Sequence, residues 1–443
     1  MPKKILKNAI IVSDSKRIES DLLIEDQFIS KIDRDISDAH AEVHDLKGAF
    51  LIPGCIDNQV HFREPGLTHK GTIESGSRAA LAGGITTFME QPNTQPNTTT
   101  FEALEDKFQR AAKSAYVNYS FFFGGTNDNL ELIKRLPIDA CAGIKLFLGS
   151  STGNMLVDRE ETIRGIFSNT QMVIAAHCED ETIIRANTAK AIEQFGEDIP
   201  IEQHPIIRSH EACYASSSRA IELARETGAR LHVFHLSTAQ EMELFDRHLP
   251  FSEKQITAEV CLHHLWFTDA DYAEKGSLIK WNPAVKGADD RKALWEGLRN
   301  NTLDILATDH APHTLEEKQN KYLKAPSGGP LEQHALMAYL DKVEEGELDL
   351  ELLVQKFCHN PAELYKIDRR GHIKEGYYAD LVTFSKRPYT VAKDNLLYQC
   401  QWSPFEGHTF SHSIDKVWVN GHLGYADGQV NHERHAMKLK FNR

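Results

Sequence analysis

The centre of this 443-residue chain alternates between short apolar segments and segments with the residue pattern of helices. Such alternation favours parallel strands in one sheet with helices packed against it. With an opening strand in the stretch 51–67, the candidate strands give about eight β/α units, the number in a closed parallel barrel. We therefore expect an α/β fold, a (β/α)8 TIM-type barrel. The other candidate strands are 85–91, 117–123, 142–148, 171–177, 230–236, 256–261 and 303–309, and the clearest helical patterns are 74–82, 101–113 and 216–227.

Both ends of the chain differ from this centre, because short strand-like segments there are separated by polar breaks. The segments are 9–12, 21–24 and 28–32 near the start, and 371–376, 379–384 and 416–421 near the end. The chain is long enough for a barrel and one accessory unit. We expect residues 1–52 and 369–443 to form one discontinuous β-sandwich domain, and residues 53–368 to form the barrel.

Composition limits the classes of function. The net charge of −14 argues against a nucleic-acid surface, although a local arginine could still bind a small anionic substrate. No apolar run approaches the ~20 residues of a membrane span, and the first residues lack the apolar core of a signal peptide. The seven cysteines are dispersed, which is typical of reduced thiols rather than a disulfide framework. We expect a globular cytoplasmic protein that binds neither nucleic acid nor membrane.

Residues able to bind a metal or an anion fall at or near the C-terminal ends of different predicted strands. In a β/α barrel these ends meet at one face, where active sites are built. A single strand-end histidine is commonly a structural residue, but five metal-capable positions at strand ends favour a metal site. In the opening strand, alternation would place Gln59, His61 and Arg63 on one face before a turn at Glu64-Pro-Gly66. The five metal-capable residues are His61, Lys145, His177, His235 and Asp309, and the two residues suited to an anion are Arg63 and Asn93.

The ligand types indicate the metal. Histidine nitrogens and a carboxylate oxygen suit zinc and similar divalent ions. Lys145 lies inside an apolar strand, where burial would lower its pKa and give a neutral amine. Such an amine can take up carbon dioxide to form a carbamate that bridges two metals. The alternative is an ion pair between Lys145 and a nearby acid.

Four motifs resemble the amidohydrolase superfamily, in particular its cyclic-amide hydrolases with a carbamylated lysine and, among these, the dihydroorotase branch. The resemblance covers nearly the whole chain. It implies zinc, with one ion held by Gln59, His61, Lys145 and Asp309, a second by Lys145, His177 and His235, and Asp309 as the catalytic acid and base. The motifs are His61-Phe-Arg63-Glu-Pro-Gly66, Ala79-Ala-Leu-Ala-Gly-Gly-Ile-Thr-Thr87, Gln91-Pro-Asn93-Thr94 and Ala307-Thr-Asp309-His-Ala-Pro-His313.

One position departs from the family pattern. The family has His-x-His on the opening strand, whereas this chain has Gln59-Val-His61. An amide oxygen is a weaker zinc ligand than an imidazole nitrogen. The first metal site is therefore expected to be weakened, completed by water or empty, which gives one or two zinc ions per chain.

The resemblance also implies a substrate and the residues that bind it. The reaction is reversible hydrolysis of dihydroorotate to N-carbamoyl-L-aspartate in pyrimidine biosynthesis. Arg63 can grip the substrate carboxylate as a bidentate fork. Residues implied to help are Asn93, Asn282, His313 and, in the loop 325–330, Ser327 and Gly328. A homodimer, and association with other enzymes of the pathway, are further expectations.

Two other readings stay open at this point. One is a hydantoinase or allantoinase, whose families share the metal ligands but usually lack the equivalent of Arg63. The other is a catalytically impaired scaffold, suggested by Gln59. The remaining histidines are given no catalytic role: His263 and His264 are expected to be buried and structural, and His204 and His210 to lie at the surface or rim.

Overall fold

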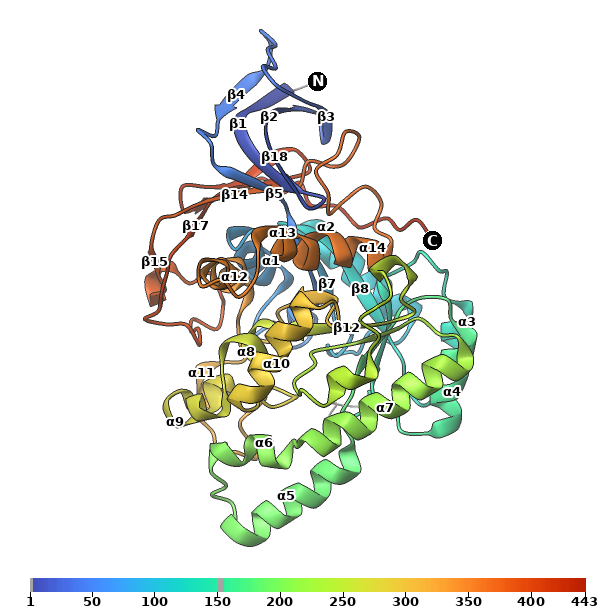
Figure 1. Cartoon of the computed structure of the whole chain (residues 1–443). Coiled ribbons are helices and arrows are strands. Elements are labelled where there is room, and N and C mark those ends of the chain that lie inside the picture. Colours follow the sequence, from blue (N-terminus) through green and yellow to red (C-terminus); the bar gives the residue numbers. More distant parts are fainter. Residues whose placement is uncertain (1–2, 150–154) are drawn as a thin grey trace.

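The computed structural model describes residues 3–149 and 155–443 and contains an eight-stranded parallel sheet with its strands in chain order. The backbone N–H of His61, just after the first strand, donates to the carbonyl of His310, just after the last, at 2.7 Å. This bond brings the two ends of the sheet together, so the barrel prediction is confirmed (Figure 1). The strands are β6 (Cys55–Val60), β7 (Ile85–Glu90), β8 (Asn118–Gly124), β9 (Gly143–Phe147), β10 (Ile174–His177), β11 (Leu231–Val233), β12 (Ile256–Cys261) and β13 (Ile305–Ala307).

Helices surround the barrel, and their ends follow local sequence signals. Thr72 begins the first helix with a capping box to Ser75, and Gly228 ends the long helix α7 with a left-handed φ of 70°. The helices are α1 (Ile73–Ala82), α2 (Phe101–Ser114), α3 (Leu130–Arg135), α4 (Glu160–Asn169), α5 (Glu181–Phe195), α6 (His204–Ile207), α7 (His210–Thr227), α8 (Leu262–Trp266), α9 (Tyr272–Lys275), α10 (Ala288–Arg299), α11 (Leu315–Lys318), α12 (Ala335–Glu344), α13 (Leu350–Val354) and α14 (Asn360–Tyr365).

Both ends of the chain join in a second sheet of nine strands, drawn above the barrel in Figure 1. It is mostly antiparallel, and the pairing of β5 with β14 links its N-terminal and C-terminal parts. The accessory β unit expected from the two termini is thus present. Its strands are β1 (Lys3–Ser13), β2 (Lys16–Glu25), β3 (Phe28–Asp33), β4 (Glu42–Asp45), β5 (Phe50–Pro53), β14 (Leu381–Ser385), β17 (Ser413–Val419), β18 (His422–Ala426) and β19 (Gln429–Val430).

Two expectations about strands are wrong. Residues 371–376 form turns instead of a strand, and Gly371 and Gly376 adopt left-handed φ angles of 79° and 83° that an extended strand excludes. The opening barrel strand ends at Val60, and Arg63 has a φ of 73°. Strand alternation therefore does not decide where Arg63 points.

The C-terminal part of the chain also contacts the barrel. Between β15 (Tyr389–Thr390) and β16 (Thr409–Phe410) the chain reaches the loop after β13, where the Trp402 indole N–H donates to the carbonyl of His313 at 2.7 Å. Inside the barrel, Ile56, Met89, Phe122 and Phe234 form a packed apolar layer. The interior of the barrel is therefore a packed core. No helix in the described part of the chain is long and apolar enough to cross a membrane.

Candidate active site

Four of the predicted metal ligands form two close pairs. His61 Nε2 lies 3.2 Å from Asp309 Oδ1, and His177 Nδ1 lies 2.9 Å from His235 Nε2. They follow or end β6, β13, β10 and β11. All four are largely buried, and burial lowers the pKa of each histidine below its usual value. Neutral imidazoles are the form that binds metal ions.

Lys145 lies close enough to both pairs for its charge to act on each of them. Its ammonium charge, in addition to burial, lowers the pKa of His61, His177 and His235. The side chain is 1% exposed, and its Nζ lies 3.8 Å from the centre of the Phe234 ring. Burial lowers the pKa of Lys145 to about 7. Within residues 3–149 and 155–443 it forms no ion pair, which argues against the alternative of a lysine held by an acid.

Hydrogen bonds determine which ring nitrogen of His61 and which of His177 is available to bind a metal ion. His61 Nδ1 lies 2.8 Å from Asn93 Oδ1, and His177 Nε2 lies 3.0 Å from Glu179 Oε2. Both oxygens accept, so with the Asn93 amide oriented in this way these nitrogens carry the protons. His61 Nε2 and His177 Nδ1 then direct lone pairs toward Asp309 and His235.

Glu179 is a site residue that the sequence prediction missed. Its carboxylate bonds to His177 and is also paired with Arg208. Although burial opposes ionisation, Arg208 and His177 lower the pKa of Glu179 to about 2. An ionised carboxylate behind a metal-binding imidazole fixes its tautomer and raises its basicity. The sequence contained a sign of this role, because Glu179 is an acidic residue only two positions after the predicted metal ligand His177.

Asp309 is suited to proton transfer. It has a φ of 51°, outside the strand, and its side chain faces His61. Burial raises the pKa of Asp309 to about 7, against the opposing charges of Lys145, His177 and Arg63. A carboxyl group with a pKa near neutrality can both accept and donate a proton.

Gln59 is buried at the same end of the barrel, on β6. Its Oε1 lies 3.3 Å from the Cys261 thiol, which donates to it. The oxygen that would bind a metal therefore already has a hydrogen-bond partner. Its role as a ligand stays a prediction.

We expect the Gln59→His variant to hold zinc more tightly, by about one order of magnitude, because an imidazole nitrogen replaces an amide oxygen. The measurement is zinc retained per chain during titration with a chelator. Gln59→Leu, which offers no ligand atom, is the control. Equal retention by the wild type, Gln59→His and Gln59→Leu proteins would show that this position does not bind metal.

The residues expected to bind a carboxylate adjoin the ligand pairs. Arg63 Nε donates to the carbonyl of Pro312 at 2.9 Å, and Arg63 Nη2 lies 2.9 Å from His313 Nε2. Burial lowers the pKa of Arg63 to about 10, so the guanidinium remains charged at neutral pH. Asn93 uses its oxygen for His61, and its amide nitrogen has no acceptor in the part of the chain that the structure describes, so it can donate to a ligand. Arg63, Asn93 and His313, which we call the carboxylate corner, combine hydrogen-bond donors with the buried positive charge of Arg63.

The loop 325–330 closes the same corner. Ser327 Oγ donates to Asn282 Oδ1 at 2.8 Å, and the Gly328 N–H donates to the carbonyl of Lys280 at 2.8 Å. A Cβ on Gly328 would lie 2.5 Å from the Ala311 carbonyl oxygen, and its φ is 122°, so this position requires glycine. Buried Lys318 donates to the carbonyls of Pro326 and Gly328 and fastens the loop from behind.

Histidines outside the site have structural partners. His263 and His264 are buried as expected, with His263 stacked on Trp281 and His264 within 3.1 Å of the Pro283 carbonyl. The expectation for His204 is wrong: it is fully buried and contacts Tyr322 Oη and the carbonyl of Trp281. Sequence position alone did not show that α6 packs inward.

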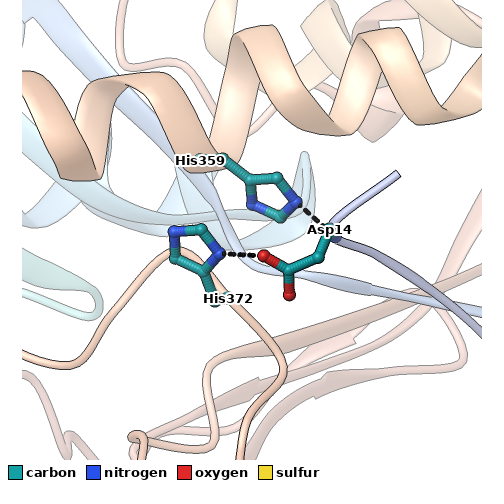
Figure 2. Close-up of side chains that lie close together, drawn as sticks. All are labelled: Asp14, His359 and His372. Carbon is teal, nitrogen blue, oxygen red and sulfur yellow. Dashed lines mark hydrogen bonds and ion pairs between the residues drawn. The ribbon is translucent and has the colours of Figure 1, made fainter. Parts of the chain in front are cut away.

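A second group of possible metal ligands lies where the nine-stranded sheet meets the barrel (Figure 2). His359 Nε2 accepts from the backbone N–H of Asp14 at 2.9 Å, and its Nδ1 donates to the Gly371 carbonyl. His372 lies 2.9 Å from the Asp14 carboxylate, which Lys374 also contacts at 3.1 Å. Because both His359 nitrogens are occupied and a lysine already neutralises Asp14, these residues join the turn after β1 to the helical segment that ends at His359, without offering a metal site.

The donor set at the barrel end, in contrast, fits a divalent cation. It combines two imidazole lone pairs, a third histidine, a carboxylate and a lysine without an ion pair among the described residues. This composition is typical of zinc and related ions rather than of calcium or magnesium. Together the barrel and these residues are typical of barrel enzymes whose active site can hold a divalent cation.

Comparison with known proteins agrees with this class. The Amidohydrolase family profile matches residues 50–424. A dihydroorotase from Halobacterium salinarum is 35% identical, covering 81% of this chain and 82% of that protein. A dihydroorotase from Carboxydothermus hydrogenoformans is 34% identical, covering 91% and 93%. The solved structure of an L-hydantoinase (dihydropyrimidinase) from Arthrobacter aurescens superposes with a TM-score of 0.94 at 29% identity, covering 99% of this chain and 100% of that chain. The chain belongs to the amidohydrolase family.

Proposed function

We propose that this protein catalyses the dihydroorotase reaction, the reversible hydrolysis of the ring amide of (S)-dihydroorotate to N-carbamoyl-L-aspartate. Support comes from the dihydroorotase relatives and from the site itself. The observation that carries the proposal is the buried, charged Arg63 beside His313 and Asn93, next to the two ligand pairs. A carboxylated ring could place its carboxylate on these donors and its amide over the ligands.

The chain's own residues supply binding and proton transfer. Arg63, with Asn93 and His313, orients the substrate through its carboxylate, which converts binding into positioning. Zinc, held by His61, His177, His235, Asp309 and carbamylated Lys145, would supply a Lewis acid and lower the pKa of a water molecule. Asp309 accepts a proton as water oxygen bonds to the ring carbonyl carbon. It then delivers that proton to the ring nitrogen as the carbon–nitrogen bond breaks. Ring closure follows the same steps in reverse.

The competing function is hydrolysis of an uncarboxylated ring. The similarity to the hydantoinase structure supports this function. The overall fold and the metal ligands do not decide between the two, because they would serve either substrate. Arg63 argues the other way. The Pro312 carbonyl and His313 compensate only part of the desolvation of this buried guanidinium, and a bound anion would compensate more. We therefore favour a substrate that carries a carboxylate.

The direct test is an assay of purified protein with dihydroorotate, dihydrouracil and hydantoin, with zinc measured in the same sample. We expect dihydroorotate to be the best substrate by kcat/KM. A higher kcat/KM for hydantoin or dihydrouracil would overturn the proposal in favour of a hydantoinase. Less than one zinc per chain, with no activity after adding zinc and bicarbonate, would favour a non-catalytic scaffold.

The proposed reaction places the protein in pyrimidine biosynthesis. A cytoplasmic location, a homodimeric state and association with other enzymes of that pathway stay predictions. Size-exclusion chromatography with light scattering measures the oligomeric state directly.

A further inference from the structure

Two buried tryptophans hold the backbone of the loop that follows β13. The indole N–H of Trp281 donates to the carbonyl of Asp309 at 3.1 Å, and the indole N–H of Trp402 donates to the carbonyl of His313 at 2.7 Å. Both tryptophans are buried. The residue suited to proton transfer and a residue of the carboxylate corner are therefore each held at the backbone by one indole.

The two indole rings meet at Gly329, in the loop 325–330. A Cβ at this glycine would lie 2.6 Å from the ring of Trp281 and 2.9 Å from the ring of Trp402, so the rings fill the space that a side chain would need. The carbonyl of Gly329 accepts from the N–H of Ala311 at 2.9 Å. The two indoles, the segment 309–313 and the loop 325–330 thus pack as one unit.

The two tryptophans come from different parts of the chain. Trp281 stacks on the buried ring of His263, with ring centres 4.5 Å apart and 14° between the ring planes. Trp402 belongs to the segment between β15 and β16. That segment is also attached to the loop after β6, because Gln399 Nε2 donates to the carbonyl of Thr68 at 2.6 Å. Each indole is therefore held in place by its own surroundings.

Trp281 acts on the residue that transfers the proton. Asp309 has a φ of 51°, a left-handed conformation that is unfavourable for a residue with a Cβ. The bond from Trp281 orients the carbonyl of Asp309 and helps to hold this conformation, in which the carboxylate faces His61. Removal of the indole N–H would take a donor from a buried carbonyl and loosen this arrangement.

Trp402 acts on the carboxylate corner. The carbonyl of Pro312 accepts from Arg63 Nε at 2.9 Å, and the next carbonyl along the chain, that of His313, accepts from Trp402. The bond from Trp402 therefore fixes the piece of backbone that carries both the acceptor for Arg63 and the His313 ring, which lies 2.9 Å from Arg63 Nη2. A shift of this backbone would turn the guanidinium away from the substrate carboxylate.

We propose that the two indoles are positioning residues with separate roles. Trp281 holds Asp309 for proton transfer. Trp402 holds the carboxylate corner around Arg63 for substrate binding. The inference rests on the proposed function, because it assigns each indole to a residue of that reaction. Neither tryptophan is required to touch the substrate.

The first test replaces each tryptophan by phenylalanine, which keeps an aromatic ring and removes the indole N–H. We expect Trp281→Phe to lower kcat about tenfold to a hundredfold on dihydroorotate and on dihydrouracil alike, because Asp309 transfers the proton for either substrate. We expect Trp402→Phe to raise KM for dihydroorotate about tenfold with kcat within about threefold, and to leave kcat/KM for dihydrouracil unchanged.

The proposal fails if Trp281→Phe leaves kcat unchanged. It also fails if Trp402→Phe leaves KM for dihydroorotate unchanged, or if that variant loses activity equally on both substrates.

Trp295→Phe is the matched control. Trp295 is buried in α10, and its indole N–H donates to the carbonyl of Leu265 at 3.0 Å. The same substitution thus removes the same kind of bond at α8 instead of at the loop after β13. Its kcat and KM should stay within about threefold of the wild type. Losses as large as those of the other two variants would show a general destabilisation and would overturn the proposal.

The second test does not depend on turnover. Hydrogen–deuterium exchange of the full-length protein as purified, followed by mass spectrometry, measures how firmly the segment 309–313 and the loop 325–330 are held. The N–H of Ala311, bonded to the carbonyl of Gly329, is one of the groups that it reports.

We expect exchange in peptides from this segment and this loop to be about tenfold faster in Trp281→Phe and in Trp402→Phe, and unchanged in Trp295→Phe. Exchange at the wild-type rate in the first two variants would overturn the proposal. If dihydroorotate is not a substrate but Trp281→Phe still lowers kcat on the ring that is hydrolysed, the proposed function fails while the role of Trp281 stands.

Discussion

Lys145→Ala is expected to reduce dihydroorotate turnover by at least about a thousandfold, and small carboxylic acids such as acetate or propionate are expected to restore part of it. Lys145 is buried near the two ligand pairs, and burial lowers its pKa to about 7, which leaves a substantial neutral fraction at physiological pH. A neutral amine can react with carbon dioxide. The carbamate oxygens would occupy a space that is empty in the alanine variant. An added carboxylate could fill that space and supply the missing oxygen atoms.

Two further observations separate this explanation from a simple loss of packing. Lys145→Met keeps most of the side-chain volume, so it should be equally inactive but should not respond to added acid. Intact-mass measurement of the wild type under gentle conditions should show the added mass of one carbon dioxide. An unmodified Lys145 in active, metal-loaded protein would contradict the carbamate, and rescue of Lys145→Met would show that the acid acts elsewhere.

The arrangement of the fold could be predicted because it follows from sequence periodicity. Alternating strands and helices imply a barrel, and in a barrel the strand ends converge. His61, His177, His235 and Asp309 therefore meet although the chain separates them by up to 248 residues. This inference requires the order of strands and no knowledge of side-chain geometry.

The details that decide the chemistry did not follow from periodicity. Arg63 lies beyond the end of its strand with a φ of 73°, so alternation was the wrong rule for it. Trp402 reaches the carbonyl of His313 across 89 residues of sequence, and no local pattern predicts such a contact. Residues 371–376 contain strand-forming residues, but the left-handed glycines at both ends impose turns. Loops follow tertiary contacts, so a single sequence specifies them less clearly than strands.

Arg63→Met is expected to reverse the substrate preference. The change removes the charged fork that would hold the substrate carboxylate, and loss of one partner of a buried charge pair costs about 3–4 kcal/mol. This corresponds to a few hundredfold in kcat/KM for dihydroorotate. Dihydrouracil has no carboxylate, so its kcat/KM should change little. The ratio of the two values is the quantity to measure, because misfolding or metal loss would reduce both.

Arg63→Lys tests whether charge alone is enough. A lysine keeps the positive charge but offers a point donor in place of a planar fork. It would also lose the bond from Arg63 Nε to the Pro312 carbonyl that orients the guanidinium. We expect activity on dihydroorotate between those of the wild type and Arg63→Met. If Arg63→Met leaves dihydroorotate turnover intact, the carboxylate does not bind at this corner, and a hydantoin-type substrate becomes the better account of the site.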